Sequence, residues 1–332
     1  MKASEFKTKD MKVLIVCSHR YYAPYTGYVA PFIYEQMQGL KVLGCEFQVC
    51  FVQGGGGWIS YMRAWQDLNR MIKEYKPDII HAHYGLCCLI ANLQRKIPVI
   101  STYHGSDINE KKVRWLSKIA IRLSKINIFV SKALQTIAGN PKGSIVIPCG
   151  VDVNHFRPMD KQECRRALEM VPDKPYILFS KEFADKVKNY PLAKSAVERL
   201  GKNVELLEFY GYTREQVPLL YNAVDCGLLT SFTEGSPQFV KEAIACGCPI
   251  VSTDVGDVKE VIDGVKNALT RILNNYARAN KLIKDTDDIK TLEKYFANID
   301  KYFHIEITRI ESKGNFLGTL ILFKDITQHT ID

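Results

Sequence analysis

The chain has 332 residues, enough for two domains of ordinary size. Apolar residues make up 46% of it and charged residues 24%, a balance that excludes a disordered or low-complexity protein. The net charge of +9 favours anionic ligands, but it is not clustered into the basic patch of a nucleic-acid-binding protein, so we expect no nucleic-acid partner. No apolar run approaches the roughly 20 residues of a membrane-spanning helix.

The start of the chain and its cysteines indicate the compartment. The first ten residues, MKASEFKTKD, are polar and lack the apolar core of a secretory signal. None of the ten cysteines forms a CxxC pair, and most lie in apolar stretches, as small buried residues do. We therefore expect a cytoplasmic protein with reduced thiols, in which residues 1–10 are an N-terminal extension.

In the first half of the chain, short apolar strands alternate with helical patterns. The expected strands are 12–17, 47–52, 78–82, 99–102, 126–130 and 144–148. The expected helices are 31–43, 61–75 and 110–125. This alternation predicts a parallel sheet covered by helices on both faces. We predict a doubly wound, Rossmann-like α/β domain over 11–155.

The second half repeats this pattern and predicts a second Rossmann-like domain over 156–265. The expected strands are 176–180, 204–208, 226–229 and 249–253. The expected helices are 191–200, 214–223 and 236–246. Ser236 is expected to be the N-cap of the last helix, with Pro237 in its first turn. The segment 148–158 between the two domains suits a hinge.

The pattern changes after about residue 265, and we predict a separate C-terminal tail over 266–332. Residues 268–298 are charged and have a helical pattern. Residues 303–310 and 318–323 alternate as the two strands of an antiparallel hairpin do. All ten cysteines precede residue 249, so the composition changes near the same place.

The segment TEGSPQFVKEAIACGCPIVSTDVG, at 233–256, has the clearest chemical pattern. Glu234 precedes a predicted helix, and Glu242 lies inside it. The free N–H groups and the positive dipole end at a helix start form an anion site suited to a diphosphate, and Gly235 lets the backbone approach it. Carboxylates before and within the helix can accept hydrogen bonds from sugar and ribose hydroxyls.

This segment resembles the E-x7-E motif of glycosyltransferase family 4, the retaining GT-B enzymes. Further stretches are similar to family segments in the same order, namely PDIIHAHYG (77–85), STYHGSDI (101–108), PCGVDVNHFRP (148–158), KNYPLA (188–193) and NAVDCGLLTSFTEGSP (222–237). The resemblance covers about residues 11–264. It implies the GT-B fold, in which a donor cleft lies between two Rossmann-like domains.

The resemblance implies three catalytic residues. Glu234 would contact the hydroxyls of the transferred sugar, and Lys188 would stabilise the diphosphate as it leaves. His104, after the strand 99–102, would face the donor sugar near its reacting carbon. These roles belong to the transfer of a sugar from a nucleotide-diphosphate donor.

The resemblance also implies how the donor is held. Glu242 would bind the nucleotide ribose, while the backbone of Gly235 and Ser236 would meet the phosphates, as would Gly27 in the first loop. No metal ion or other cofactor is implied, because positive side chains and a helix dipole stabilise the diphosphate.

The sequence departs from the family in three places. Glu182 stands where the family usually has an arginine, and an acidic group beside a diphosphate is unfavourable. Gly27 stands alone where many members have a glycine pair. The tail differs most, because 302–327 resembles the end of a PAS sensor domain and 274–283 resembles an earlier PAS helix.

Three patterns have competing interpretations. His81 and His83 form an HxH at a strand end, for which we favour a structural role over a metal site because no third ligand is evident. Asp285 and Asp287 form a DxD that follows no strand, and we discount it. For helix 110–125 we favour an ordinary cover helix, but peripheral contact with the inner face of a membrane stays open. Its basic residues at helical spacing are Lys111, Arg114, Lys118, Arg122 and Lys125.

We therefore predict a hexosyltransferase-type enzyme that moves a sugar to an acceptor hydroxyl with retention, in the synthesis of a cell-surface glycan or glycolipid. The acceptor is expected on the first domain, near 18–31 and 54–61. The alternative is a catalytically impaired or regulatory GT-B-like protein, whose PAS-like tail serves in sensing or dimerisation. A nicotinamide dehydrogenase is excluded because SHRYYAPYTG, not G-x-G-x-x-G, follows the first strand.

Overall fold

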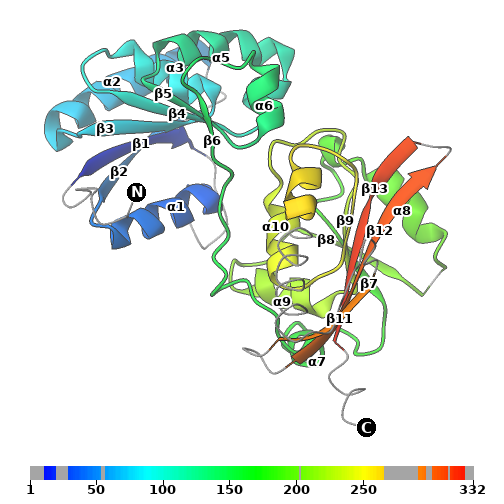
Figure 1. Ribbon diagram of the computed structural model, residues 1–332. Helices are drawn as coiled ribbons and strands as arrows, with labels where there is room; N and C mark the ends of the chain where they lie inside the picture. Colours follow the sequence, from blue (N-terminus) through cyan, green and yellow to red (C-terminus); the bar gives the residue numbers. More distant parts are fainter. Residues whose placement is uncertain are drawn as a thin grey trace, which may run out of the picture. The chain divides into compact units, whose positions relative to one another are not determined.

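The computed structural model describes residues 11–19, 29–53, 57–201 and 203–264, and the backbone of the strands at 291–296, 301–312 and 315–325. The chain divides into two compact units, Met1–Gly150 and Val151–Asp332 (Figure 1). This division falls inside the segment 148–158, where the sequence predicts a linker. No helix formed by the described residues is long and apolar enough to cross a membrane.

The first unit contains the predicted parallel sheet. Its six strands lie in the order β2-β1-β3-β4-β5-β6, and all neighbouring pairs are parallel. The strands are β1 (Lys12–Ser18), β2 (Glu46–Val52), β3 (Ile79–His83), β4 (Val99–Tyr103), β5 (Ile126–Phe129) and β6 (Ile145–Val146). The helices are α1 (Pro31–Val42), α2 (Gly57–Tyr75), α3 (Gly85–Leu93), α4 (Ser106–Asn109), α5 (Lys111–Leu123) and α6 (Lys132–Ile137).

Both faces of this sheet are covered, as predicted. Successive side chains of a strand point to opposite faces, so a strand buried on both sides is apolar throughout. Leu14 belongs to a core with Leu68 of α2, whereas Val13 and Ile15 belong to another core with Ile33 of α1. Figure 1 shows α1 on one side of the sheet and α2, α3 and α5 on the other.

Helix α3 was not expected from the sequence. Its residues, GLCCLIANL, are buried on most sides, so the helix has no polar face and no helical periodicity. It begins at Gly85, where an added Cβ would lie 1.9 Å from Ser117 Oγ of α5. Only glycine fits there, and the close contact of α3 with α5 depends on it.

The second unit also has a sheet of the predicted kind. Strands β7 (Tyr176–Phe179), β8 (Glu205–Glu208), β9 (Cys226–Leu229) and β10 (Ile250–Ser252) pair in parallel in the order β10-β9-β7-β8. Its helices are α7 (Lys161–Ala167), the 3-10 helix η2 (Lys186–Lys188), α8 (Tyr190–Glu198), α9 (Gln216–Ala223) and α10 (Gln238–Ala245). Leu178 belongs to a core with Leu220 of α9, and Phe179 to one with Ala193 of α8, so both faces are again buried.

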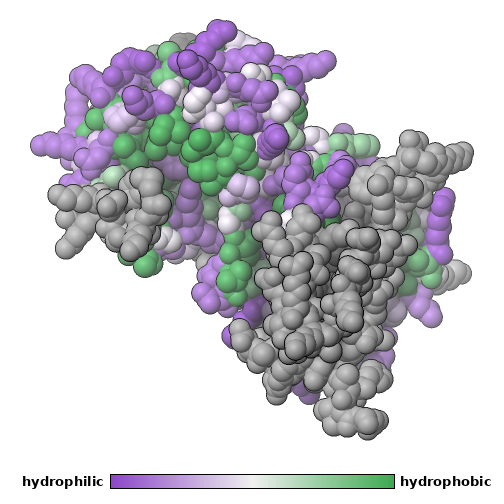
Figure 2. Space-filling model, in the orientation of Figure 1, coloured by the Kyte–Doolittle hydropathy of each residue, from purple (hydrophilic) through white to green (hydrophobic). Residues whose placement is uncertain are grey.

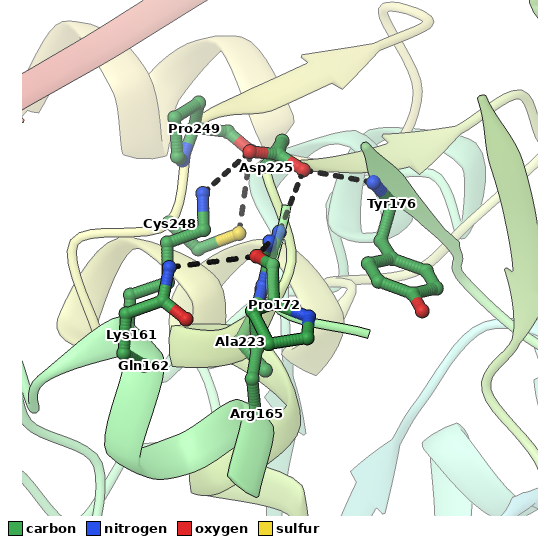
Figure 3. A network of polar contacts seen from close by, with 9 residues as sticks. All are labelled: Lys161, Gln162, Arg165, Pro172, Tyr176, Ala223, Asp225, Cys248 and Pro249. Carbon is green, nitrogen blue, oxygen red and sulfur yellow. Dashed lines mark hydrogen bonds and ion pairs between the residues drawn. The ribbon is translucent and has the colours of Figure 1, made fainter. Parts of the chain in front are cut away.

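A polar network around Asp225 joins three elements of this unit (Figure 3). The Asp225 carboxylate accepts hydrogen bonds from Lys161 Nζ at 2.5 Å and from the Tyr176 backbone N–H at 2.8 Å, and it pairs with Arg165 at 3.0 Å. Arg165 also donates to the Ala223 carbonyl at 2.8 Å. Although partial burial opposes ionisation, these donors lower the pKa of Asp225. The network fixes α7 to the start of β7 and β9.

The tail strands extend the sheet of the second unit. Strands β11 (Thr291–Phe296), β12 (Lys301–Ser312) and β13 (Asn315–Asp325) pair antiparallel, and β13 pairs with β10. The predicted hairpin is confirmed. The helical expectation is wrong for Thr291–Phe296, where pairing with β12 overrides the local pattern. The resemblance of the tail to a PAS domain stays a prediction, and Asp285 and Asp287 lie outside the described residues.

Candidate active site

Two of the predicted catalytic residues meet in the second unit. Lys188, the last residue of η2, donates a hydrogen bond to Glu234 Oε1, and Ser231 Oγ donates to the same oxygen at 2.6 Å. The Lys188 and Glu234 side chains are only 17% and 14% exposed. The loop after β9 is fixed to η2, because Thr230 Oγ1 donates to the Lys188 carbonyl at 2.9 Å. The fold thus joins a cation and a carboxylate that are 46 positions apart in the chain.

The loop at 234–236 packs closely against the loop that follows β10. Gly256 has a φ of +63°, and an added Cβ would lie 2.9 Å from the Gly235 carbonyl oxygen. Ser236 Oγ donates to Asp257 Oδ2 at 2.6 Å and accepts from Lys241 Nζ at 3.0 Å. Burial raises the pKa of Asp257. The Ser236 hydroxyl is therefore committed to Asp257, which leaves its backbone for the predicted phosphate contact.

The expected cap of α10 is wrong in detail. The helix begins at Gln238, Pro237 is its N-cap, and no side chain caps it. Pro237 is extended, with a ψ of 115°, so Ser236 lies outside the helix and its side chain turns to Asp257 instead. Two residues of non-helical backbone therefore separate Gly235 from the helix start.

The second predicted carboxylate, Glu242, is enclosed by its own unit. Its side chain is 4% exposed, and it pairs with Arg214 Nη2 at 2.8 Å and accepts from Tyr221 Oη at 3.1 Å. Burial, and then the Glu242 carboxylate, raise the pKa of Tyr221 well above its usual range. Arg214 also lies over the ring of Phe156, 4.4 Å from its centroid. A ribose can reach Glu242 only if one of these contacts opens, so ribose binding by Glu242 stays a prediction.

His104, the third predicted catalytic residue, follows β4 in the first unit and lies among aromatic rings. Its Nε2 is 3.0 Å from Nδ1 of His83, and its ring centroid is 4.9 Å from that of Tyr84 and 4.7 Å from that of Phe32. Burial, and then the neighbouring histidines, lower the pKa of His83 well below its usual range. The contact with His83 therefore orients the His104 ring.

The HxH pair lies inside the first unit, and the structural role that we favoured for it stays a prediction. His81 is fully buried and lies within hydrogen-bond distance of Thr102 Oγ1, at 2.8 Å. Burial lowers the pKa of His81 to about 4. Within the described part of the chain, no three His, Cys, Asp or Glu side chains are placed to hold a metal ion. The sequence did not reveal that His83 would contact His104.

A pocket of about 510 Å³ opens at the carboxyl ends of β1, β2 and β3. Ser18, His19 and Tyr61 line it, from the two regions where we expected the acceptor. Tyr84 lines it as well and also contacts the His104 ring. The predicted phosphate-binding Gly27 lies outside the described residues.

The exposed surface of helix α5 includes apolar side chains as well as charged ones. Its buried residues are Ser117, Ala120 and Ile121, while Trp115 is 59% exposed and Ile119 is 36% exposed. Arg114 turns back to the carbonyls of Ile108 and Asn109, so it leaves the basic surface that was expected to include it. On the face shown in Figure 2, the first unit has a hydrophobic area bordered by hydrophilic residues.

Comparison with known proteins supports the same assignment for both units. The profile described as Glycosyltransferase Family 4 matches residues 3–155, and the profile described as Glycosyl transferases group 1 matches residues 184–287. Each unit thus contains a segment that matches a glycosyltransferase profile, family 4 in the first unit and group 1 in the second. Sucrose-phosphate synthase from Thermosynechococcus elongatus has the same fold, with a TM-score of 0.61 over 80% of this chain and 90% of that one. At 16% identity, this likeness shows the fold alone.

Two curated relatives are glycosyltransferases. The putative teichuronic acid biosynthesis glycosyltransferase TuaC of Bacillus subtilis is 26% identical over 242 residues, which cover 64% of this chain and 62% of TuaC. A D-inositol 3-phosphate glycosyltransferase of Actinosynnema mirum is 22% identical over 249 residues, 58% of this chain and 60% of that protein. The chain thus spans about three fifths of the length of these GT-B relatives.

Proposed function

We propose that this GT-B glycosyltransferase transfers a hexose from a nucleotide-diphosphate sugar to an acceptor hydroxyl, with retention of the anomeric configuration. The bond between the anomeric carbon and the diphosphate oxygen breaks, and a bond from that carbon to the acceptor oxygen forms. The acceptor hydroxyl loses its proton, and the nucleoside diphosphate leaves with the electron pair. The contact of Lys188 with Glu234 carries this proposal, because a diphosphate requires a cation and sugar hydroxyls require an acceptor, and these two groups lie side by side.

The roles follow from charge. Lys188 stabilises the negative charge that develops on the leaving diphosphate, together with the backbone at Gly235 and Ser236. Glu234 accepts hydrogen bonds from the hydroxyls of the transferred sugar, and Glu242 those of the ribose. In this proposal the cationic side chain supplies the charge stabilisation, so transfer needs no metal ion. The role proposed for His104 is contact with the donor sugar.

The proposed pathway is the synthesis of a cell-surface glycan or glycolipid. The name of the relative TuaC, which refers to teichuronic acid biosynthesis, supports it. Peripheral contact of α5 with an anionic membrane belongs to this proposal. Lys111, Lys118 and Arg122 surround the exposed Trp115, and basic residues around an exposed aromatic ring favour the membrane interface. The triple change of these three residues to Glu is expected to abolish binding to anionic liposomes.

A thermal-shift screen against UDP-, GDP-, ADP- and dTDP-sugars tests the donor proposal. A ligand at about 100 times its dissociation constant stabilises the folded state by about 2.7 kcal/mol, so one nucleotide class is expected to raise the melting temperature. Lys188→Ala should remove this shift, while Lys194→Ala, which changes an exposed lysine on α8, should keep it. Nuclear magnetic resonance of the product then gives its anomeric configuration.

The alternative, a catalytically impaired regulatory protein, has one observation in its favour. Glu242 is already paired with Arg214 and Tyr221, and these contacts compete with a nucleotide. In this case the PAS-like tail would serve in sensing or dimerisation. A chain that neither binds nor consumes any of the four nucleotide-sugar classes would establish the alternative.

A further inference from the structure

The acceptor side of the reaction has a defined pocket in the first unit. Its volume of about 510 Å³ lies in the range of small-ligand pockets, roughly 300–1,000 Å³. Tyr84 belongs to its wall, and the Tyr84 ring centroid is 4.9 Å from that of His104. An occupant of this pocket is therefore separated from the predicted catalytic histidine by one aromatic ring.

The pocket is acidic. Two carboxylates line it, Asp107 of α4 and Glu110 at the start of α5, and the described residues that line it include no lysine or arginine. Arg114, one turn further along α5, donates to the carbonyls of Ile108 at 2.5 Å and Asn109 at 2.8 Å. The Arg114 guanidinium is thus bound to the last carbonyls of α4, and Arg114 does not line the pocket.

One feature of the wall would normally attract an anion. The N-terminus of α3 lies at the pocket, and free N–H groups at a helix start favour phosphate. Here the Asp107 carboxylate accepts hydrogen bonds from the N–H groups of Gly105, at 2.8 Å, and of Gly85 and His104. Asp107 is 3% exposed. The protein's own carboxylate therefore takes the place that a phosphate group would occupy.

The remaining wall suits a sugar ring. Tyr61 and Tyr84 offer aromatic surface for the C–H faces of a sugar, while Ser18, Ser106 and the Glu110 carboxylate offer hydrogen-bonding groups for hydroxyls. The floor is rigid, because Ser117 Oγ donates to the Asp107 carbonyl at 2.7 Å and leaves no room for a side chain at position 85. Such a site is preorganised for a neutral polyol.

We infer that this pocket binds an uncharged sugar residue of the acceptor and discriminates against phosphorylated polyols. The inference rests on the proposed function and names the acceptor class. A neutral acceptor would distinguish this chain from the relative of Actinosynnema mirum, whose name specifies the phosphorylated acceptor D-inositol 3-phosphate. The charge of Glu110 is the main discriminating element, because a phosphate group in the pocket would approach this carboxylate and the described part of the lining includes no lysine or arginine.

Saturation-transfer nuclear magnetic resonance on the full chain, in the presence of UDP, tests the inference. The neutral probes are the methyl glycosides of glucose, galactose and N-acetylglucosamine. The phosphorylated probes are glucose 6-phosphate and D-myo-inositol 3-phosphate. At least one glycoside is expected to bind about tenfold more tightly than either phosphate. Equal or tighter binding of a phosphate, or no binding of any glycoside, would overturn the inference.

Charge reversal sharpens this test. Glu110→Lys should shift the ratio of phosphate to glycoside affinity about tenfold toward phosphate, and Glu110→Gln should shift it less. Glu74→Lys, at an exposed position on α2 outside the pocket lining, is the matched control and should leave the ratio unchanged. An unchanged ratio in Glu110→Lys, with circular dichroism showing a folded protein, would also refute the inference.

The two proposals fail separately. The thermal shift with UDP reports on the donor site of the second unit, whereas glycoside binding reports on the first. A chain that binds UDP but no glycoside retains the proposed function and loses this inference. A chain that binds glycosides but no nucleotide sugar loses the proposed function.

Discussion

Replacing Arg214 by alanine tests whether Glu242 depends on its buried partner. The two side chains are 9% and 4% exposed, and 2.8 Å separates Arg214 Nη2 from Glu242 Oε1. Removing one partner of such a pair leaves a buried charge without compensation, which costs about 3–5 kcal/mol. Arg214→Ala also removes the contact with the Phe156 ring. For a unit of this size, we expect the melting temperature to fall by roughly 6–20 °C.

Urea unfolding followed by circular dichroism measures this loss. Arg166→Ala is the control, because Arg166 and Glu163 are 3.9 Å apart and both more than 70% exposed, so its cost should stay below about 0.5 kcal/mol. The double variant Arg214→Met/Glu242→Gln should recover part of the stability, since no charge is then buried unpaired. If the free energy of unfolding of Arg214→Ala is within about 1 kcal/mol of that of the unchanged protein, the buried pair does not stabilise the second unit as we argue.

Three further outcomes are expected. Burial raises the pKa of Asp107 to about 6, above its unfolded value near 3.9, so its ionisation costs stability as the pH rises through this interval. The free energy of unfolding of Asp107→Asn relative to the unchanged protein should therefore increase by about 2 kcal/mol between pH 4 and pH 7; a constant difference would contradict this. His83→Ala should slow sugar transfer by about 10–100-fold, because His104 is then misplaced. The same variant should bind UDP unchanged in the thermal-shift assay. Equal loss of the transfer rate and of UDP binding would indicate that His83 is merely structural. Asp225→Ala should destabilise the second unit by about 3 kcal/mol in urea, because it leaves the buried Arg165 unpaired, whereas an effect below 1 kcal/mol would mean that the network in Figure 3 contributes little.

The sequence was sufficient to predict two parallel sheets, one in each half of the chain. Strands such as β1 and β7 are short and mainly apolar, a pattern that burial on both faces produces. It also predicted that Lys188 and Glu234 act together, although only the family resemblance supported this before the structure placed them in contact. Helix α3 was not predicted, because a helix that is apolar on nearly all sides lacks the polar face by which a helix is recognised in a sequence.

The partners of the site residues could not be predicted in the same way. Arg214 precedes α9 and Glu242 lies in α10, and no local pattern shows that their side chains meet. The same holds for His83 with His104 and for Ser236 with Asp257, each pair joined across strands or loops. Strand β11 was mistaken for a helix because its strand character depends on pairing with β12.

The release of nucleoside diphosphate from a bound nucleotide sugar tests the central claim most directly. The claim is that Lys188 and Glu234 form the donor site of a working glycosyltransferase. With the donor that the thermal-shift screen identifies, the unchanged chain and Lys194→Ala should release nucleoside diphosphate at equal rates. Lys188→Ala and Glu234→Gln should each be slower by about 10²–10³-fold. Release at the same rate from all four proteins, or from none of them, would contradict the claim.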